Sequence, residues 1–341
     1  MISMLVKSKL FLFSSIILLL IISSPPVLSS IGDRSEEFQT CVKTCLSTVC
    51  SQNPTLPLHL RFFAWTCEDE CKYNCMHEIT DHAIHSNQEI HQYYGKWPFH
   101  RLLGIQEPAS VLFSVLNGYM HYRYLPLLKR LPDPYYMKKF YLIYAYVGIN
   151  SWIWSIIYHS RDFPLTEKLD YYSAGLAILY SLFYGVLRIF QIRNLQQTTL
   201  WAFICLTAYV SHVSYLHFIK FDYGYNILAN VIVGMLNNLL WIGWSISHWY
   251  KRPDDAWKPI VCVTLILLAM SLEIFDFPPW WGIVDAHALW HLSTIYLIAY
   301  WYNFLLEDAR IESFRESKGK KIDRTKFKTN NIKLEKFLHW Y

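Results

Sequence analysis

The chain has 341 residues, of which 53% are hydrophobic and 17% aromatic, while only 17% are charged. Soluble domains rarely combine so much apolar content with so little charge, so the composition argues against an ordinary soluble protein. The net charge of +5 is small, and the excess basic residues lie in short loops and in a C-terminal tail. Membrane orientation explains that distribution better than a nucleic-acid partner does.

Residues 1–30 have the pattern of a secretory signal peptide. Two lysines give a positive start, an apolar run follows over residues 10–22, and small residues end the pattern at Ser29 and Ser30. An uncleaved signal anchor is the alternative. We expect cleavage, because the apolar run is short for a membrane span and small residues follow it.

Six of the eight cysteines crowd together directly after the signal. They are Cys41, Cys45, Cys50, Cys67, Cys71 and Cys75. In an oxidising lumen they predict three disulfides, and the Cys-x-x-x-Cys spacing in both halves suggests two short helices stapled together. A zinc cluster is the less favoured alternative, and the pairing stays open. Cys205 and Cys262 lie in apolar runs and are expected to be ordinary buried thiols.

The lumenal segment expected over residues 31–103 also carries four histidines among polar residues: His77, His82, His85 and His91. They could form a metal site or lie on a solvated polar helix. We expect the polar helix, because no cysteine or strong acidic pattern completes a ligand set.

Seven apolar runs follow, each near the roughly 20 residues that span a bilayer. They lie at about 106–126, 139–159, 169–189, 198–219, 225–247, 257–275 and 282–304. The expected fold is an all-α membrane protein: a seven-transmembrane helix bundle over residues 104–305, with a small disulfide-rich lumenal segment before it.

The basic residues of the loops predict the orientation of this multi-pass chain. Lys and Arg concentrate in the first, third and fifth loops between spans, which become cytosolic if the N-terminus is lumenal. Residues 306–341 carry ten more Lys or Arg residues, and we expect a cytosolic, solvated tail without fixed structure. The chain ends in Leu-His-Trp-Tyr, without a retention signal, which favours the Golgi membrane over the endoplasmic reticulum.

Five polar residues fall at similar depth near the lumenal ends of three expected spans. His287 and His291 are four residues apart at the start of the seventh span, so they share one helix face. Ser155 and His159 have the same spacing at the end of the second span, and Asp170 begins the third. Histidines that merely pack helices together would not gather at one depth, so the combination indicates a functional site.

The residue types predict a catalytic zinc site. His159, His287 and His291 can supply three neutral nitrogens to Zn²⁺, which leaves one position open for a water whose pKa falls to about 7. Asp170 could deprotonate that water and return a proton to the leaving group. Ser155 could donate a hydrogen bond to the developing oxyanion, or simply bond to the backbone of its own helix.

Three further polar residues remain without a firm role. Asp285 could orient a ligand histidine or cap the seventh helix. His212 and His217, five residues apart in the fourth span, could be structural or face the substrate.

The Ser155-x-x-x-His159, Asp170 and His287-x-x-x-His291 set resembles a superfamily of seven-span hydrolases that includes the alkaline ceramidases and the progestin and adipoQ receptors. More specifically, the chain resembles the Per-one-like family, that of post-GPI-attachment-to-proteins factor three. The similarity runs through nearly all of the mature chain, in residues 32–34, 65–75, 95–99, 106–110, 163–171 and 285–287.

This resemblance implies lipid remodelling of GPI-anchored proteins in the secretory pathway. The reaction it implies is of phospholipase A2 type and removes the unsaturated sn-2 acyl chain from the phosphatidylinositol. The partners would be GPI-anchored proteins, their lipid and the membrane. A ceramidase-like amidase and a non-enzymatic receptor or GPI-processing factor are the alternatives.

Overall fold

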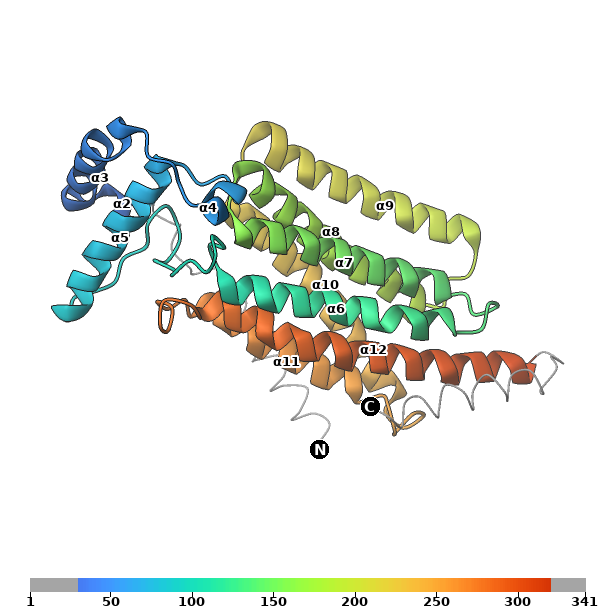
Figure 1. Ribbon diagram of the computed structural model, residues 1–341. Coiled ribbons are helices and arrows are strands. Elements are labelled where there is room, and N and C mark those ends of the chain that lie inside the picture. Colours follow the sequence, from blue (N-terminus) through green and yellow to red (C-terminus); the bar gives the residue numbers. More distant parts are fainter. Residues whose placement is uncertain (1–29, 320–341) are drawn as a thin grey trace.

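The structure is a computed structural model that describes residues 30–319 (Figure 1). Over this range the regular elements are helices, and the only β-type pairings are isolated bridges. The helices are α2 (Ile31–Arg34), α3 (Glu36–Thr48), η1 (Cys50–Gln52), α4 (Leu58–Phe62), α5 (Cys67–His85), α6 (Pro108–Lys129), α7 (Lys138–Ser160), α8 (Pro164–Ile189), α9 (Leu195–Ser214), η2 (Tyr215–Ile219), α10 (Tyr223–His248), α11 (Lys258–Ile274) and α12 (Ala286–Gly319). The all-α prediction is confirmed. The expected signal peptide lies outside the described residues except for Ser30, which is buried in the folded chain.

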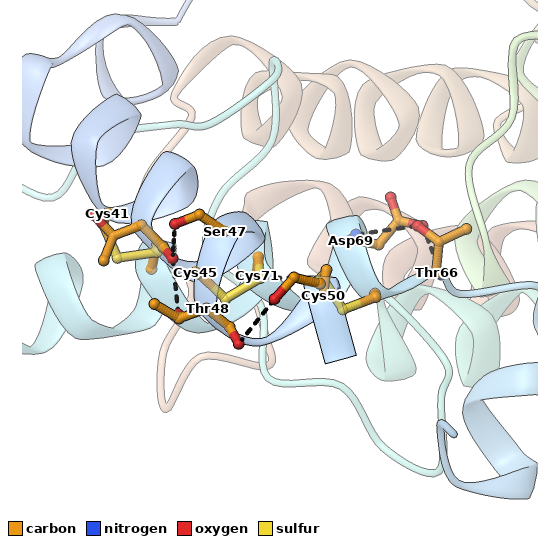
Figure 2. The surroundings of a disulfide bond; sticks show 12 residues. Cys41, Cys45, Ser47, Thr48, Cys50, Thr66, Asp69 and Cys71 are labelled. Atoms are coloured by element: carbon orange, nitrogen blue, oxygen red, sulfur yellow. Dashed lines mark hydrogen bonds between the residues drawn. A yellow bond between two sulfur atoms is a disulfide. The ribbon is translucent and has the colours of Figure 1, made fainter. Parts of the chain in front are cut away.

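The cysteine-rich domain, residues 30–105, lies beside one end of the long helices (Figure 1). Its α3 begins at the Ser35 cap, and its α5 begins at a capping box between Thr66 and Asp69. Three disulfides join α3 and the turn after it to α5 in nested order: Cys41–Cys75, Cys45–Cys71 and Cys50–Cys67 (Figure 2). The three predicted disulfides and the two stapled helices are confirmed, and the pairing is now known.

Each of the seven predicted apolar runs coincides with one of the long helices α6 to α12. Four of them are long and apolar enough to cross a membrane: α7, α8, α9 continued by η2, and α10. The chain is therefore a membrane protein, and the crossing of all seven helices stays a prediction. Prolines in the first turn start α6, α8 and α11, where a missing backbone N–H costs no helical hydrogen bond.

Helix α6 lies between α7 and α12, while α8 packs against α7 and α10, and α11 against α12. Helix α9 contacts mainly α8 and lies at the outside of the bundle (Figure 1). Its apolar side chains are exposed, such as Leu200 and Phe203 at 62% and 65%. Cys205 is its one buried α-helical residue, and Cys262 lies on α11. Both thiols are free, as expected, but only Cys205 is buried and Cys262 is half-buried.

Close packing limits the residues that α6 and α7 can present to each other. A Cβ at Gly148 of α7 would lie 2.3 Å from the ring of His121 on α6. That ring is buried and its Nδ1 lies 2.8 Å from the hydroxyl of Tyr302 on α12. Glycine is therefore required where the two helices approach.

A buried ion network closes the bundle at the end far from the cysteine-rich domain. Asp308 of α12 accepts two hydrogen bonds of 2.6 Å from Arg188 of α8 and one of 2.7 Å from Arg252, in the turn before α11. Arg252 also pairs with Asp255. Fully desolvated charges are stable only when paired in this way.

The same network corrects the prediction for the C-terminal tail. We expected a disordered charge run from residue 306, but α12 continues to Gly319 and buries Leu306, Asp308 and Ala309. The charged residues suggested a solvated segment, but the side chain of Asp308 points inward and pairs with arginines from other elements. The part of the predicted tail after residue 319 lies outside the described residues.

Candidate metal centre

Three histidine rings meet where the end of α7 faces the start of α12. His159 lies in the last turn of α7, and His287 and His291 lie one turn apart on α12. The Nε2 atoms of His159 and His287 are 3.4 Å apart, and one ring nitrogen from each of the three lies within 4.8 Å of the others. His159 and His291 are buried, and the side chain of His287 is 34% exposed. The structure thus brings all three predicted ligand residues together.

Each ring is held by a partner at Nδ1. The Nδ1 of His159 lies 2.7 Å from the carboxylate of Glu107, and that of His287 lies 2.9 Å from Glu273. A carboxylate accepts a hydrogen bond, so these Nδ1 atoms carry the proton and the Nε2 atoms present lone pairs.

The third ring has a neutral partner. The Nδ1 of His291 lies 2.9 Å from the hydroxyl of Ser114 on α6. That hydroxyl is also 2.7 Å from the backbone carbonyl of Ser110, to which it donates. Its oxygen is then free to accept the Nδ1 proton of His291, which leaves the other ring nitrogen available as a ligand.

This donor set fits a zinc ion. The 3.4 Å between the Nε2 atoms is long for a hydrogen bond, which one ring would donate only when protonated on both nitrogens, and it suits two ligands of one cation. Tetrahedral zinc, with Zn–N bonds of about 2.0–2.1 Å, separates its ligand nitrogens by about 3.4 Å. Three protein ligands leave a fourth position open, as in catalytic zinc sites. The ligand roles of the three histidines stay predictions.

The two other predicted site residues lie on the same helices or within electrostatic range of the histidines. Ser155 is buried one turn before His159, and its hydroxyl is 3.0 Å from that of Ser114 rather than on a ring. Asp170 lies in the second turn of α8, half-buried, and its carboxylate interacts electrostatically with His159 and His287. Their catalytic roles stay predictions.

The residues that hold the rings, namely Glu107, Glu273 and Ser114, were missed by sequence reasoning. Two of them carried a usable signal. Glu107 directly precedes the proline that begins α6, and Glu273 is the one acidic residue in the 257–275 run. A carboxylate alone in apolar surroundings is costly and is itself a sign of function. Ser114 resembles any other serine within an apolar helix and carried no such signal.

A lysine from the cysteine-rich domain completes the surroundings of Glu107. The amine of Lys96 pairs with Glu107 and lies 3.4 Å from the carboxylate of Asp162, in the turn between α7 and α8. Burial lowers the pKa of this amine, but the two carboxylates outweigh burial and raise the pKa above its ordinary value. A permanent positive charge therefore stands next to the carboxylate that orients His159.

The remaining polar candidates lie elsewhere or have a local role. Asp285 caps α12, because its carboxylate accepts a hydrogen bond of 2.8 Å from the backbone N–H of Ala288. His212 contacts the hydroxyl of Tyr225 at 3.3 Å, and His217 packs against aromatic rings. Of the four histidines expected on a solvated polar helix, His82 and His85 are exposed on α5. His77, also on α5, is half-buried and stacks on the ring of His100, and His91 lies after the helix, so the polar-helix prediction is confirmed only in part.

Comparison with known proteins identifies the family. The model of the Per1-like family matches residues 57–309. The chain belongs to the Per1-like family. It is 40% identical over 307 residues to the "Protein PER1 homolog" of Schizosaccharomyces pombe, which covers 87% of this chain and 91% of that protein.

Two animal members are similarly related. The "Post-GPI attachment to proteins factor 3" of Drosophila melanogaster is 40% identical over 304 residues, 85% of this chain and 92% of the fly protein. The human "GPI-specific phospholipase A2-like PGAP3" is 36% identical over 304 residues, 86% of this chain and 93% of the human protein. No solved structure matches the chain.

The family assignment confirms the resemblance predicted from the motifs. The range matched to the Per1-like family contains the three histidines together with Glu107 and Glu273. The first three bridged cysteines precede it, so the α3 half of the disulfide hairpin lies outside the matched range.

Proposed function

We propose that this Per1-like protein is a zinc-dependent, phospholipase A2-like hydrolase that removes the sn-2 acyl chain from the phosphatidylinositol of GPI-anchored proteins. One observation carries the reaction type: three histidines, two of them oriented by carboxylates, converge at one end of an apolar helix bundle. The names of its relatives support the substrate, since several are called GPI-specific phospholipase A2-like.

We further propose that all seven long helices cross the membrane, with the histidines at the lumenal side, in the Golgi. His287 and Asp308 lie on one helix, about 32 Å apart at about 1.5 Å per residue. That distance is close to the roughly 30 Å thickness of the hydrocarbon core, so the histidine cluster and the ion network suit opposite faces. Trp280 and Trp281, 52% and 81% exposed just before α12, suit an aromatic belt at the lumenal interface.

Asp170 and Ser155 have different roles in the proposed hydrolysis. His159, His287 and His291 would hold a zinc ion, which would supply a Lewis acid to the ester or to the attacking water. Asp170 takes a proton from the attacking water as the water oxygen bonds to the ester carbonyl carbon. Ser155, whose hydroxyl rests against Ser114, turns to donate a hydrogen bond to the carbonyl oxygen as that oxygen gains negative charge. When the ester C–O bond breaks, Asp170 returns the proton to the glycerol oxygen, which yields a fatty acid and a lyso-lipid.

The test is an analysis of GPI acyl chains in cells that carry His287→Ala or Asp170→Ala in place of the parent chain. We expect the unsaturated sn-2 chain to be retained in both, while His217→Ala, which changes a histidine away from the cluster, behaves like the parent. Complete removal of that chain by well-expressed Asp170→Ala would refute the proposal. Purified protein given ceramide in parallel separates ester from amide hydrolysis.

A further inference from the structure

A cavity of about 200 Å³ lies between the cysteine-rich domain and the ends of α6, α7 and α8, and no role in the proposed reaction accounts for it. Seven aromatic side chains line it, together with four cationic side chains, each of which is paired with a carboxylate. Ligand sites are concave, largely aromatic and equipped with a few charged groups, and this cavity has that composition.

Two of the four cationic side chains, those of the arginines, are held by contacts on more than one side. The guanidinium groups of Arg101 and Arg161 lie on the indole of Trp65, at 4.3 Å and 3.8 Å from a ring centroid. Arg101 pairs with Glu70, and Arg161 with Asp69 at 3.1 Å. Cations fixed in this way reach an anionic ligand without losing further side-chain freedom.

One wall of the cavity is a preformed turn. Tyr93 and Lys96 exchange two backbone hydrogen bonds of 2.8 Å and 3.0 Å, and the residues between them, Tyr94 and Gly95, have φ of 52° and 80°. A positive φ is strained for tyrosine, so its persistence indicates that the turn is held from outside. The side chain of Asp33 accepts a hydrogen bond of 2.9 Å from the backbone N–H of Tyr94, and the hydroxyl of Ser30 accepts one of 2.6 Å from that of Gly95.

The turn connects the cavity to the histidine cluster. Lys96 lines the cavity and also pairs with Glu107, which in turn holds His159. A ligand in the cavity is therefore separated from the reacting centre by only two side chains.

We propose that the cavity binds the phosphorylated sugar head group of the lipid substrate, with aromatic rings against the sugar and Lys72 and its basic neighbours toward phosphate. The inference rests on the proposed function for the identity of the lipid. Charged donors favour phosphate, and flat aromatic faces favour the apolar side of a sugar ring. The volume suits one ring with its substituents, such as inositol phosphate, rather than a whole glycan.

Direct binding tests this proposal without any need for hydrolysis. Full-length protein in detergent is titrated with inositol 1-phosphate, which is one ring with its phosphate and no acyl chain, and binding is measured by calorimetry. We expect saturable binding, and tenfold or greater weakening with Lys72→Gln. The side chain of Lys72 is 33% exposed and its ion pair with Glu68 lies at the surface, so this variant keeps the fold. Lys43→Gln, at an exposed lysine of α3 outside the cavity, is the matched control and should bind like the parent.

A second variant covers the aromatic wall. Tyr94→Gly removes the ring and relieves the strained backbone, because glycine adopts a positive φ freely, so the turn persists. It should also weaken binding. The proposal is overturned if the parent shows no binding, if both variants bind as tightly as the parent, or if inorganic phosphate alone binds equally well. Failure of hydrolysis with intact binding would count against the proposed function and not against the cavity.

Discussion

Replacing Glu107 by glutamine isolates the contribution of one buried carboxylate to the candidate metal centre. Glu107 is 4% exposed and holds two partners, the Nδ1 of His159 at 2.7 Å and the amine of Lys96. Glutamine keeps the shape, but its one oxygen can serve only one of the two donors, and its amide must then face the other. The charge that raises the basicity of the histidine is lost as well.

The expected loss follows from these contacts. Removing a partner of a ligand histidine typically lowers metal affinity by about 10- to 100-fold. Because the glutamine amide also faces the Lys96 amine, we expect a loss near the upper end of this range, about 100-fold, which is about 2.7 kcal/mol of zinc-binding free energy. The assay is zinc content by mass spectrometry together with competition against a chelator, and thermal unfolding of the same samples reports on stability.

The matched control is Glu89→Gln, at an exposed glutamate of the cysteine-rich domain that contacts none of the three rings. It should bind zinc like the parent. If Glu107→Gln also retains the zinc affinity of the parent, the carboxylate does not orient the histidine for metal binding, and the reasoning is wrong.

Three further predictions concern stability. Asp308→Asn should lower the free energy of unfolding by about 3–5 kcal/mol, because two buried guanidinium groups lose their shared anion. Thermal unfolding measures this, and Asp133→Asn, at an exposed aspartate, is the control whose stability should change little. Gly148→Ala should cost about 1–3 kcal/mol through overpacking against the histidine ring beside it, whereas Gly243→Ala, with open space around its Cβ, should not destabilise, as the same melts will show. Burial lowers the pKa of His77, the stacked ring of His100 and nearby Arg101 lower it further, and the Phe99 carbonyl and Asp81 only partly offset this. Below a pH of about 6.5 the unfolded chain therefore binds a proton that the folded chain does not, and the free energy of unfolding should fall. His77→Gln should flatten that pH dependence in thermal melts at pH 7.5 and 5.5.

The spacing of polar residues was enough to anticipate the histidine cluster. Two helical repeats of four, at residues 155/159 and 287/291, each place two side chains on one face. The order of the apolar runs then places both faces at the same end of the bundle. Helical spacing depends only on residues close in sequence, and the direction of each helix follows from the number of helices before it. Both can therefore be predicted from the sequence alone.

The partners of the rings could not be read in the same way. Glu273 and Glu107 lie at helix boundaries, far in sequence from the histidines they hold, and only the tertiary arrangement brings them into contact. The inward direction of Asp308 was hidden for the same reason, since a charge run looks alike whether it faces solvent or buried arginines. Long-range pairing of charges depends on packing that no local pattern records.

The nested order of the disulfides has a consequence for how the cysteine-rich domain survives chemical damage. The innermost bridge closes a separation of 17 residues, and each outer bridge then encloses only a few more residues of chain on either side. Each further bond closes a short additional loop, and because the entropy lost grows only slowly with loop size, each bond still restricts the unfolded chain. After reduction of any single bond, the other two still join the two halves of the hairpin. The halves can therefore separate only when all three bonds have been reduced.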